Sequence, residues 1–491
     1  MNPYATPIPA ASPIRTDVAV VGAGGAGLYT ALHAARAGAR VVLISATQLA
    51  FTSSYWAQGG IAAALAIEDT PDRHRADTEE AGRGLVRRSA ANALVREAAR
   101  AVEDLQQLGV RFDGDRHGNL ALGLEGGHSV RRVVHAGGSA TGRRVVRQLS
   151  ALVAEDPRVA VFEGARAAQL WLDDDGRCAG VVCEDGRAIH ARGTILASGG
   201  AAALWSRTTN PPGSVGIGMQ LAHQAGAALA DLEFVQFHPT AVTGIEGREG
   251  FLITEAIRGE GATLHDATGE RFVEELKPRD EVSRAIVDKM HDEGSTHVRL
   301  DMRAIDPALF PNVVGALREA GLDPEREMIP VAPAAHYFMG GVVADLDGAT
   351  TVPGLYAIGE TSCTGLHGAN RLASNSLTEC FVWGRRAALA ALDEPEPGES
   401  APPTAGTIEL PSRETRKAMW KHAGIQRTPE GLTAMLSDPH PLARLVAACA
   451  LHREESRGAH WRSDRPATDP ALDGQHTVIR NGSSPAYEPW R

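Results

Sequence analysis

A strand, a glycine-rich turn and a helix follow one another near the start of the chain. Residues 17–21 (DVAVV) are apolar and typical of a buried parallel strand, residues 22–27 (GAGGAG) follow directly, and residues 28–37 favour a helix. Residues 41–44 (VVLI) are a second apolar strand. This order is that of a βαβ unit with the spacing GxGxxG, which binds a dinucleotide. The pattern therefore predicts a Rossmann-like α/β domain.

The glycines of this turn have separate physical roles. Gly22 allows the tight turn, Gly24 lets a pyrophosphate approach the backbone, and Gly27 lets the helix pack closely on the strand. Gly25 lies in the same turn, and the helix N-terminus that follows offers N–H donors and a positive dipole end to a phosphate. The second strand ends in Ser45 and not in the acidic residue that usually contacts a ribose. That departure weakens an NAD interpretation and leaves FAD open.

Length and charge limit the class of protein. A chain of 491 residues is too long for one ordinary core, so we expect two or three domains. Its 43% hydrophobic and 22% charged content are those of a soluble globular protein. The net charge of −11 argues against a nucleic-acid partner, although a local basic pocket for a small anion stays compatible with it.

Targeting and redox signals favour the cytoplasm. No apolar run is long enough to cross a bilayer, so we expect no membrane contact. The first fifteen residues carry Pro3, Pro7, Pro9 and Pro13 and read as a loose tail and not as a signal sequence. The five scattered cysteines fit reduced thiols and predict no metal site.

The segment from His336 to Arg371 has the features of an anion site. His336 ends one run of residues, the chain returns through a strand to a glycine turn with Glu360, and Arg371 comes just before a helix. A histidine and an arginine on tight glycine-rich backbone suit a small anion held against a flat cofactor. Taken alone, the segment leaves open an ordinary loop with a surface arginine.

Two further polar segments contain paired glycines. Residues 52–61 (TSSYWAQGGI) offer neutral donors and acceptors for a flavin ring edge, although a polar turn explains them equally well. The candidates there are Ser53, Ser54, Gln58, Gly59 and Gly60. Residues 124–136 (LEGGHSVRRVVHA) place Glu125 before two glycines and four basic or histidine side chains, and a solvated charged loop is the alternative.

Several motifs occur in a fixed order along residues 17–386. They are GAGGAG, SSYWAQGG, ILASGG, QFHPT, TEAIRGEG, PRD, AAHY, GLYAIGE and HGANRLASNSL. In this the chain resembles the fumarate reductase/succinate dehydrogenase flavoprotein superfamily. Within that superfamily, residues 124–136 are most similar to the members that oxidise L-aspartate.

The resemblance implies a Rossmann-like FAD-binding α/β domain with an inserted α+β capping domain and a C-terminal helical domain. We place the FAD-binding domain at residues 1–233 and 341–392, the capping domain at 234–340, a Pro- and Gly-containing acidic linker at 393–410, and the short helical domain at 411–491. Helices are expected over residues 78–108, with a stop at Gly109, over 413–435 and over 441–453, and Thr141 is expected to cap another helix.

The resemblance also assigns the substrate site. In the family, the positions matching His238, Thr254, His336 and Arg371 hold the two carboxylates of a C4 dicarboxylate, and the position matching Arg279 transfers a proton. A dianion buried without cations would cost several kcal/mol, whereas arginine makes paired charge-assisted hydrogen bonds to carboxylates. Each histidine alone is more often a satisfied core residue, but the set drawn from two domains favours ligand binding.

For the cofactor, the resemblance implies FAD. Ser53 stands where the respiratory enzymes carry the histidine that attaches FAD covalently, so we expect non-covalent FAD. Glu360 matches the family's acidic contact to the flavin chain. Ser376 and Leu377 begin a helix whose amides would face the flavin pyrimidine edge and stabilise charge on it. Ile217 replaces an acidic residue of the family pattern, and we expect weaker FAD retention.

Glu125 distinguishes between the possible substrates. Two like charges about 4 Å apart repel each other by roughly 4 kcal/mol at an effective dielectric near 20. Glu125 would therefore repel the carboxylates of succinate or fumarate. The ammonium group of L-aspartate could pair with it instead. Alternatively, Glu125 could face solvent or pair with Arg131 or Arg132.

Three functions stay open at this point. The first is oxidation of L-aspartate to iminoaspartate, with oxygen (giving hydrogen peroxide) or fumarate as electron acceptor. The resemblance couples it to quinolinate synthase as the first step of NAD biosynthesis. The second is a fumarate reductase or succinate dehydrogenase-type flavoprotein without an amine step. The third is a flavin-binding protein that has lost turnover.

Overall fold

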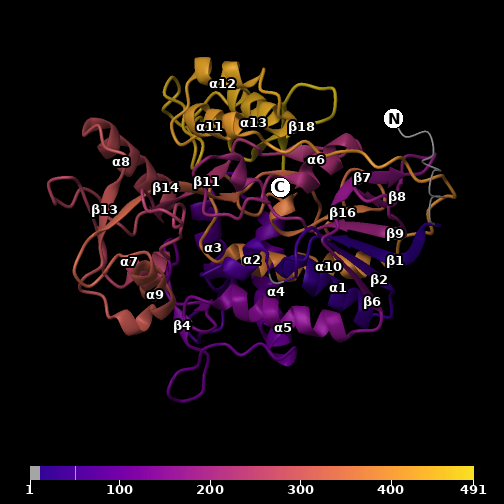
Figure 1. Cartoon of the computed structure of the whole chain (residues 1–491), viewed down its shortest axis with the longest axis horizontal. Helices are drawn as coiled ribbons and strands as arrows, with labels where there is room; N and C mark the ends of the chain where they lie inside the picture. The colour runs from indigo at the N-terminus through magenta and orange to yellow at the C-terminus, as the bar shows by residue number, and fades with distance from the viewer. Residues whose placement is uncertain (1–11, 50, 491) are drawn as a thin grey trace, which may run out of the picture.

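The computed structural model describes residues 12–49 and 51–490 (Figure 1). A twisted sheet lies on one side of the molecule and a smaller lobe on the other, and the C-terminal helices lie across one end of both. Residues 1–11 of the expected N-terminal tail lie outside the described residues, whereas Ile14 and Arg15 belong to a strand that pairs with Ile189 and His190, so the tail prediction was wrong for these two residues. Within the described residues, no helix is long and apolar enough to cross a membrane.

The seven-stranded main sheet has the strand order β6-β2-β1-β9-β8-β7, and β16 also pairs with β9. Its strands are β1 (Ile14–Val21), β2 (Val41–Ser45), β6 (Val159–Glu163), β7 (Ala167–Leu172), β8 (Cys178–Cys183), β9 (Ala188–Leu196) and β16 (Leu355–Ala357). β6, β2, β1, β9 and β16 run parallel. Val21, Leu196 and Ala357 are in register at their carboxyl ends. The loops after these three strands therefore meet at one edge, where open α/β sheets bind ligands.

Both faces of the main sheet are covered, as its continuous apolar strands predict. Val18 and Val20 pack with α1 (Gly25–Arg36) and α10 (Asn375–Ala390) on one face. Ala19 and Val21 face the opposite core. The same domain also contains α2 (Ser53–Trp56), α3 (Pro71–Ala81), α4 (Arg88–Gln107), α5 (Thr141–Glu155), α6 (Ile217–Gln224) and the short strands β3 (Ile61–Ala62), β4 (Leu122–Gly123), β5 (Val133–Val134), β10 (Leu229–Ala230), β15 (Gly341–Val343) and β17 (Ser362–Cys363).

Two local predictions in this domain were wrong. The helical pattern expected over residues 78–108 is broken between α3 and α4, because Arg83 and Gly84 adopt left-handed backbone with φ of 55° and 79°. The predicted stop is present, since α4 ends just before Gly109, whose φ is 92°. Thr141 does not cap α5 but is its first residue, and its hydroxyl accepts a hydrogen bond from the Ala136 amide at 3.1 Å.

The smaller lobe is a four-stranded antiparallel sheet with its own core. Its strands have the order β11-β14-β13-β12. They are β11 (Val235–Val242), β12 (Thr263–His265), β13 (Val298–Asp301) and β14 (Ile329–Phe338). The lobe also carries α7 (Glu255–Gly259), α8 (Arg279–Asp292) and α9 (Pro311–Glu319), which lie with β13 at the left of Figure 1. This is the α+β insertion that the sequence predicted, although the boundaries given for each domain stay a prediction.

The C-terminal part is helical, with two added strands. α11 (Arg413–His422) and α12 (Pro429–Met435) divide the expected helical region at 413–435, and α13 (Pro441–His452) follows. β18 (Gln475–Ile479) and β19 (Ala486–Pro489) were not predicted. β18 pairs with β10, so the end of the chain is joined to the FAD-binding domain through a sheet of order β17-β15-β10-β18-β19.

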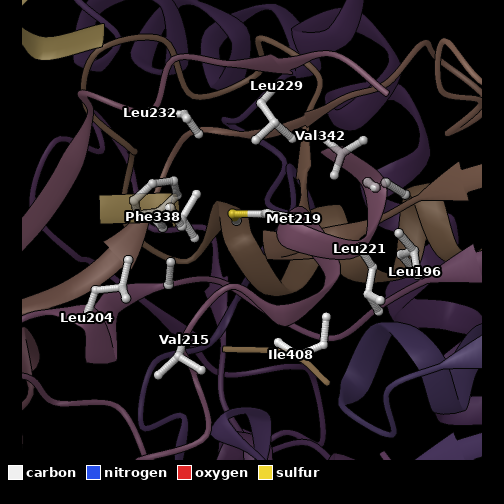
Figure 2. Close-up of a cluster of buried hydrophobic side chains, with 14 of the residues drawn as sticks. Leu196, Leu204, Val215, Met219, Leu221, Leu229, Leu232, Phe338, Val342 and Ile408 are labelled. Carbon is white, nitrogen blue, oxygen red and sulfur yellow. The ribbon is translucent and has the colours of Figure 1, made fainter. Parts of the chain in front are cut away.

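One hydrophobic core connects the parts. Figure 2 shows Met219 of α6 near Leu229 and Phe338. Ile408 of the predicted linker lies at the edge of the same cluster. Leu442 of α13 belongs to this cluster as well. The buried side chain of Ile408 therefore anchors the linker to the core, and the linker does not separate the C-terminal part from the rest.

Gly27→Ala tests the close packing of α1. A Cβ at Gly27 would lie 1.8 Å from the carbonyl oxygen of Gly22, so α1 would have to move. We expect the free energy of unfolding to fall by at least about 1–3 kcal/mol, as overpacking usually causes, and FAD content to fall with it. Thermal unfolding and the flavin-to-protein absorbance ratio measure both.

Gly315→Ala is the matched control. Gly315 lies within α9, and no heavy atom among the described residues lies within 4 Å of an added Cβ. Alanine in a helix interior is worth about 0.5–1 kcal/mol over glycine, so stability should be unchanged or rise. An equal loss in both variants would contradict the role given to Gly27.

Candidate active site

One cavity of about 950 Å³ joins the glycine turn to the smaller lobe. Most of the predicted site residues line it. These are Gly22, Gly24, Ser45, Ser53, Ser54, Gln58, Gly59, Gly60, Glu125, His238, Thr254, Arg279, His336, Glu360, Arg371, Ser376 and Leu377. Gly25 and Gly27 are not among the lining residues. The structure thus brings together side chains from both lobes that the sequence could only group by resemblance.

At the sheet end of the cavity, the backbone is shaped for a close approach. Gly22 has a φ of 114°, and a Cβ there would lie 2.3 Å from the Ala197 carbonyl oxygen. The Gly25 amide donates to Ser54 Oγ at 3.0 Å, so Ser54 occupies one of the first amides of α1. Gln58 Oε1 is buried with no hydrogen-bond partner among the described residues. An extended cavity with neutral polar groups and a glycine turn fits a dinucleotide such as FAD.

Two predicted cofactor contacts have partners within the protein. Ser53 Oγ lies 2.8 Å from Ser214 Oγ, and Ser45 Oγ donates to the Thr47 carbonyl at 2.6 Å. Ile217, the residue that departs from the family pattern, is the first residue of α6 and lines the cavity with its apolar side chain.

Glu360 follows β16 at the edge where the parallel strands end. Its Oε1 accepts a hydrogen bond from the Phe338 amide at 2.9 Å. A Cβ at Gly200 would lie 2.2 Å from that oxygen, so glycine is required beside it. Burial raises the pKa of Glu360 to about 7, against the opposing effects of the Phe338 hydrogen bond and of Arg371.

The opposite end of the cavity carries four basic side chains. Arg279 is the first residue of α8, Arg371 precedes α10, His238 lies on β11 and His336 on β14. The two imidazole centroids are 5.2 Å apart. His336 lies at a register irregularity, because Tyr337 pairs with Gln236 while Ala335 pairs with Phe237. Bulges of this kind redirect a side chain near active sites.

Gln236 holds the two arginines together. Its Oε1 accepts from Arg279 Nη1 at 2.9 Å and from Arg371 Nη2 at 3.0 Å. Arg371 also donates to Ser376 Oγ at 3.1 Å, and its guanidinium lies 4.5 Å from the Tyr337 ring centroid, a cation–π contact. Arg371 Nε is buried without a partner among the described residues.

Burial and mutual repulsion disfavour positive charge in this cluster. Burial and the charge of Arg279 lower the pKa of Arg371 to about 10. The same two causes lower the pKa of His238 and of His336 well below the usual value. Arg279 also lies at the positive end of the α8 dipole. The cluster therefore has an excess of positive potential that an anionic ligand would neutralise.

Among the described residues, Glu255 supplies the carboxylate in contact with Arg279. Its Oε2 accepts from Arg279 Nε at 2.6 Å. Burial opposes its ionisation, but Arg279 and Arg258 outweigh burial and lower its pKa. Sequence reasoning missed both Glu255 and Gln236. Their signal was adjacency, because Glu255 follows Thr254 directly and Gln236 lies two residues before His238.

Thr254 lies at the N-terminus of α7 and lines the cavity. Its side chain makes no capping hydrogen bond to the helix. The hydroxyl group is therefore not committed to α7, as the predicted contact with a substrate carboxylate requires.

Glu125 is buried and points into the same cavity. Ser374 Oγ donates to its Oε2 at 2.6 Å, and His135 Nε2 lies 3.2 Å from its Oε1. Burial opposes ionisation, but the His135 and Ser374 contacts lower the pKa of Glu125 to about 2.

The alternatives considered for Glu125 do not hold. Glu125 does not face solvent. Arg132 donates to Asp69 and Asp77 instead, and Arg131 is exposed. Sequence reasoning missed His135 and Ser374 as the partners of Glu125.

Comparisons with known proteins show which family the chain belongs to. A family model described as FAD binding domain matches residues 17–377, and one described as Fumarate reductase flavoprotein C-term matches residues 436–489. L-aspartate oxidase of Caulobacter vibrioides is 44% identical over 94% of this chain and 97% of its own, and that of Streptomyces coelicolor is 41% identical over 95% and 92%. The chain belongs to the L-aspartate oxidase family. Its cofactor is FAD.

Solved structures show how widely this architecture is shared. An E. coli quinol fumarate reductase FrdA has a TM-score of 0.87 at 28% identity over 97% of both chains. A quinol-fumarate reductase with menaquinol molecules has a TM-score of 0.88 at 29% identity over 98% of both. The FAD-binding α/β domain, the cap and the C-terminal helical region are therefore those of the fumarate reductase flavoproteins.

Gln236→Leu tests the bridge between the arginines. Both guanidiniums lose an acceptor, and hydrogen bonds to charged groups are worth about 1.5–3 kcal/mol. We expect the Kd of the holoprotein for succinate, read from the flavin spectrum, to rise about 10- to 100-fold.

Gln220→Leu controls for the loss of a buried amide. Gln220 lies in α6, and both ends of its side chain are buried without partners among the described residues. Its replacement should leave succinate affinity unchanged. If the two substitutions weaken the binding of succinate equally, Gln236 does not organise the cluster.

Proposed function

We propose that this chain oxidises L-aspartate to iminoaspartate. The observation that carries the proposal is an ionised Glu125 in the same cavity as the basic cluster. The cluster suits two carboxylates, whereas Glu125 repels them by roughly 4 kcal/mol at about 4 Å and an effective dielectric near 20. A dicarboxylate that also carries an ammonium group satisfies both the basic cluster and Glu125.

Each side chain has a role in this proposal. Arg371, His238, His336 and Thr254 hold the carboxylates, and Glu125 accepts the ammonium group. Gln236 and Glu255 keep the guanidinium of Arg279 in place, so Arg279 can deliver or accept a proton at the substrate. FAD held along the glycine turn and Glu360 would supply the hydride acceptor for C2 of the substrate and the means to pass electrons on to oxygen or fumarate.

Other parts of the proposal concern the setting of the reaction. Oxygen, giving hydrogen peroxide, or fumarate takes the electrons, and FAD is held non-covalently because Ser53 cannot form the covalent bond. Iminoaspartate would pass to quinolinate synthase, as the first step of NAD biosynthesis. All five cysteines are free thiols, which supports the proposed cytoplasmic location.

A fumarate reductase or succinate dehydrogenase-type activity is the second candidate. The solved structures named above favour it, because they share the whole architecture. The buried charge of Glu125 argues against it, because neither succinate nor fumarate has a positive group to place there.

Anaerobic mixing distinguishes the candidates. Holoprotein should lose its flavin absorbance band with L-aspartate and keep it with D-aspartate and succinate. Loss of the band with succinate but not with L-aspartate would exclude the proposed function. Loss with no dicarboxylate would indicate a flavin-binding protein without turnover.

Glu125→Gln tests the selection of the amine. The variant removes the charge that pairs with the ammonium group, and such contacts are worth about 1.5–3 kcal/mol. We expect kcat/KM for L-aspartate to fall about 10- to 100-fold or more, with fumarate reduction retained because fumarate has no amine. Steady-state rates with each substrate measure this, and an equal loss of both activities would refute the role of Glu125.

A further inference from the structure

We propose that His135 is a positioning residue that orients Glu125 and carries the ammonium proton of the substrate from Glu125 to solvent. The inference rests on the proposed function and adds a route for the proton. Oxidation of an α-amine breaks the C2–H bond as a hydride and an N–H bond as a proton. The hydride goes to the flavin, so the proton needs a path out of a buried cavity.

His135 lies between the cavity and the outside. It follows β5 directly, and its Nε2 is 3.2 Å from Glu125 Oε1. The Glu125 side chain is 4% exposed, whereas that of His135 is 19% exposed. A Cβ at Gly123 would lie 2.7 Å from His135 Cε1, so the imidazole packs tightly against β4. The geometry gives one ring edge to Glu125 and leaves part of the ring accessible.

The other groups around Glu125 do not provide such a route. Ser374 is buried, and its hydroxyl already donates to Glu125 and accepts from the Gly60 amide at 3.0 Å. His128 is buried with both ring nitrogens engaged, at 2.9 Å from the Ala373 carbonyl and 3.3 Å from Arg132 Nη1.

The other charged residues near Glu125 also have partners of their own. Glu255 holds Arg279, and Arg371 belongs to the basic cluster. Among the described residues, His135 is therefore the partner of Glu125 that connects the carboxylate to the outside.

The charges around His135 favour an exchange of protons. Burial opposes a charged imidazole, but Glu125, and to a smaller extent Asp113, raise the pKa of His135. In the free site, the contact with Glu125 therefore favours the charged form of His135. When the substrate ammonium binds Glu125, its positive charge offsets the carboxylate charge that raises the pKa of His135. His135 then releases its proton to solvent while its Nε2 stays beside Glu125 Oε1.

Neutral His135 can then accept a proton. The ammonium group passes its proton to Glu125, and Glu125 passes it to His135 Nε2 as the hydride leaves C2. One proton and one hydride leave the substrate, which becomes the iminium ion, the protonated form of the imine. Glu125 and the imidazolium are restored as the starting pair.

The sign of the pH dependence follows. Below the pKa of His135, the imidazolium competes with the substrate ammonium for Glu125. The kcat/KM for L-aspartate should therefore rise with pH through that pKa, which lies above the usual 6.5. A variant without the imidazole should lack this rise. Fumarate reduction involves no ammonium group and should not follow the same titration.

The test uses holoprotein of His135→Gln and, as matched control, His33→Gln. His33 forms a similar pair with Asp104 at 2.9 Å, with its side chain 14% exposed, away from the cavity lining. Anaerobic flavin reduction by L-aspartate, and steady-state fumarate reduction with a reduced viologen dye as electron donor, are measured across pH. We expect His135→Gln to slow reduction by L-aspartate at least about 10-fold, as lost proton transfer does, to lose the rise with pH, and to regain rate with added imidazole.

The control and the amine-free reaction complete the comparison. His33→Gln should behave as the unaltered protein, and fumarate reduction by His135→Gln should stay within about two-fold. If His135→Gln does not retain FAD, His135→Ala with added imidazole gives the same comparison. An unchanged pH profile, or an equal loss of both activities, would overturn the inference while leaving L-aspartate oxidation in place. Failure of the unaltered protein to react with L-aspartate would instead remove the proposed function and the inference together.

Discussion

Two buried guanidinium groups that share one amide oxygen set the requirements for the whole active site. Arg279 and Arg371 come from different lobes, and both donate to Gln236 Oε1. Bringing like charges together away from water is unfavourable, which is why burial and Arg279 lower the pKa of Arg371 to about 10. Glu255 offsets part of this charge at Arg279. The positive charge that Glu255 does not offset favours the binding of a dianionic ligand.

The fold supports this arrangement from several directions. The parallel strands end together and place the glycine turn and Glu360 along the cofactor part of the cavity. The irregularity at His336 interrupts the pairing of β14 with β11. Ser374 has a φ of 61°, an unfavourable value for a residue other than glycine, and its hydroxyl contacts both Glu125 and the Gly60 amide. Strain of this kind is concentrated at functional sites.

Much of the architecture could be predicted from the sequence, because its signals are local or carried by motifs. The apolar strand and glycine turn identified Gly22 and Gly24 as cavity positions, although Gly25 and Gly27 do not line the cavity, and the Arg371 segment identified Arg371. The break at Arg83 was missed although Gly82 and Gly84 flank it, and glycine after a helical run is a stop signal. β18 could not be predicted, because its contacts are distant in the sequence. The Thr477 amide, for example, donates to Asp231 across 246 residues.

Partners of the site residues were the other omission. Gln236, Glu255, His135 and Ser374 contact predicted residues only after folding. All four lie inside the quoted motifs, but a motif does not show which of its polar residues contacts which ligand-binding side chain. The role of each depends on which oxygen or nitrogen it reaches in three dimensions. The sequence thus indicated which residues surround the ligand, while the structure was needed to show what holds them.

Calorimetric titration of the holoprotein with succinate and with succinamate, its half-amide, tests the central claim most directly. The two ligands have nearly the same shape, but succinamate has one carboxylate replaced by a neutral amide. If the shared guanidinium pair binds a dianion, succinate should bind at least about 10- to 100-fold more tightly, the equivalent of one charged hydrogen bond at about 1.5–3 kcal/mol. Equal affinities would contradict the account.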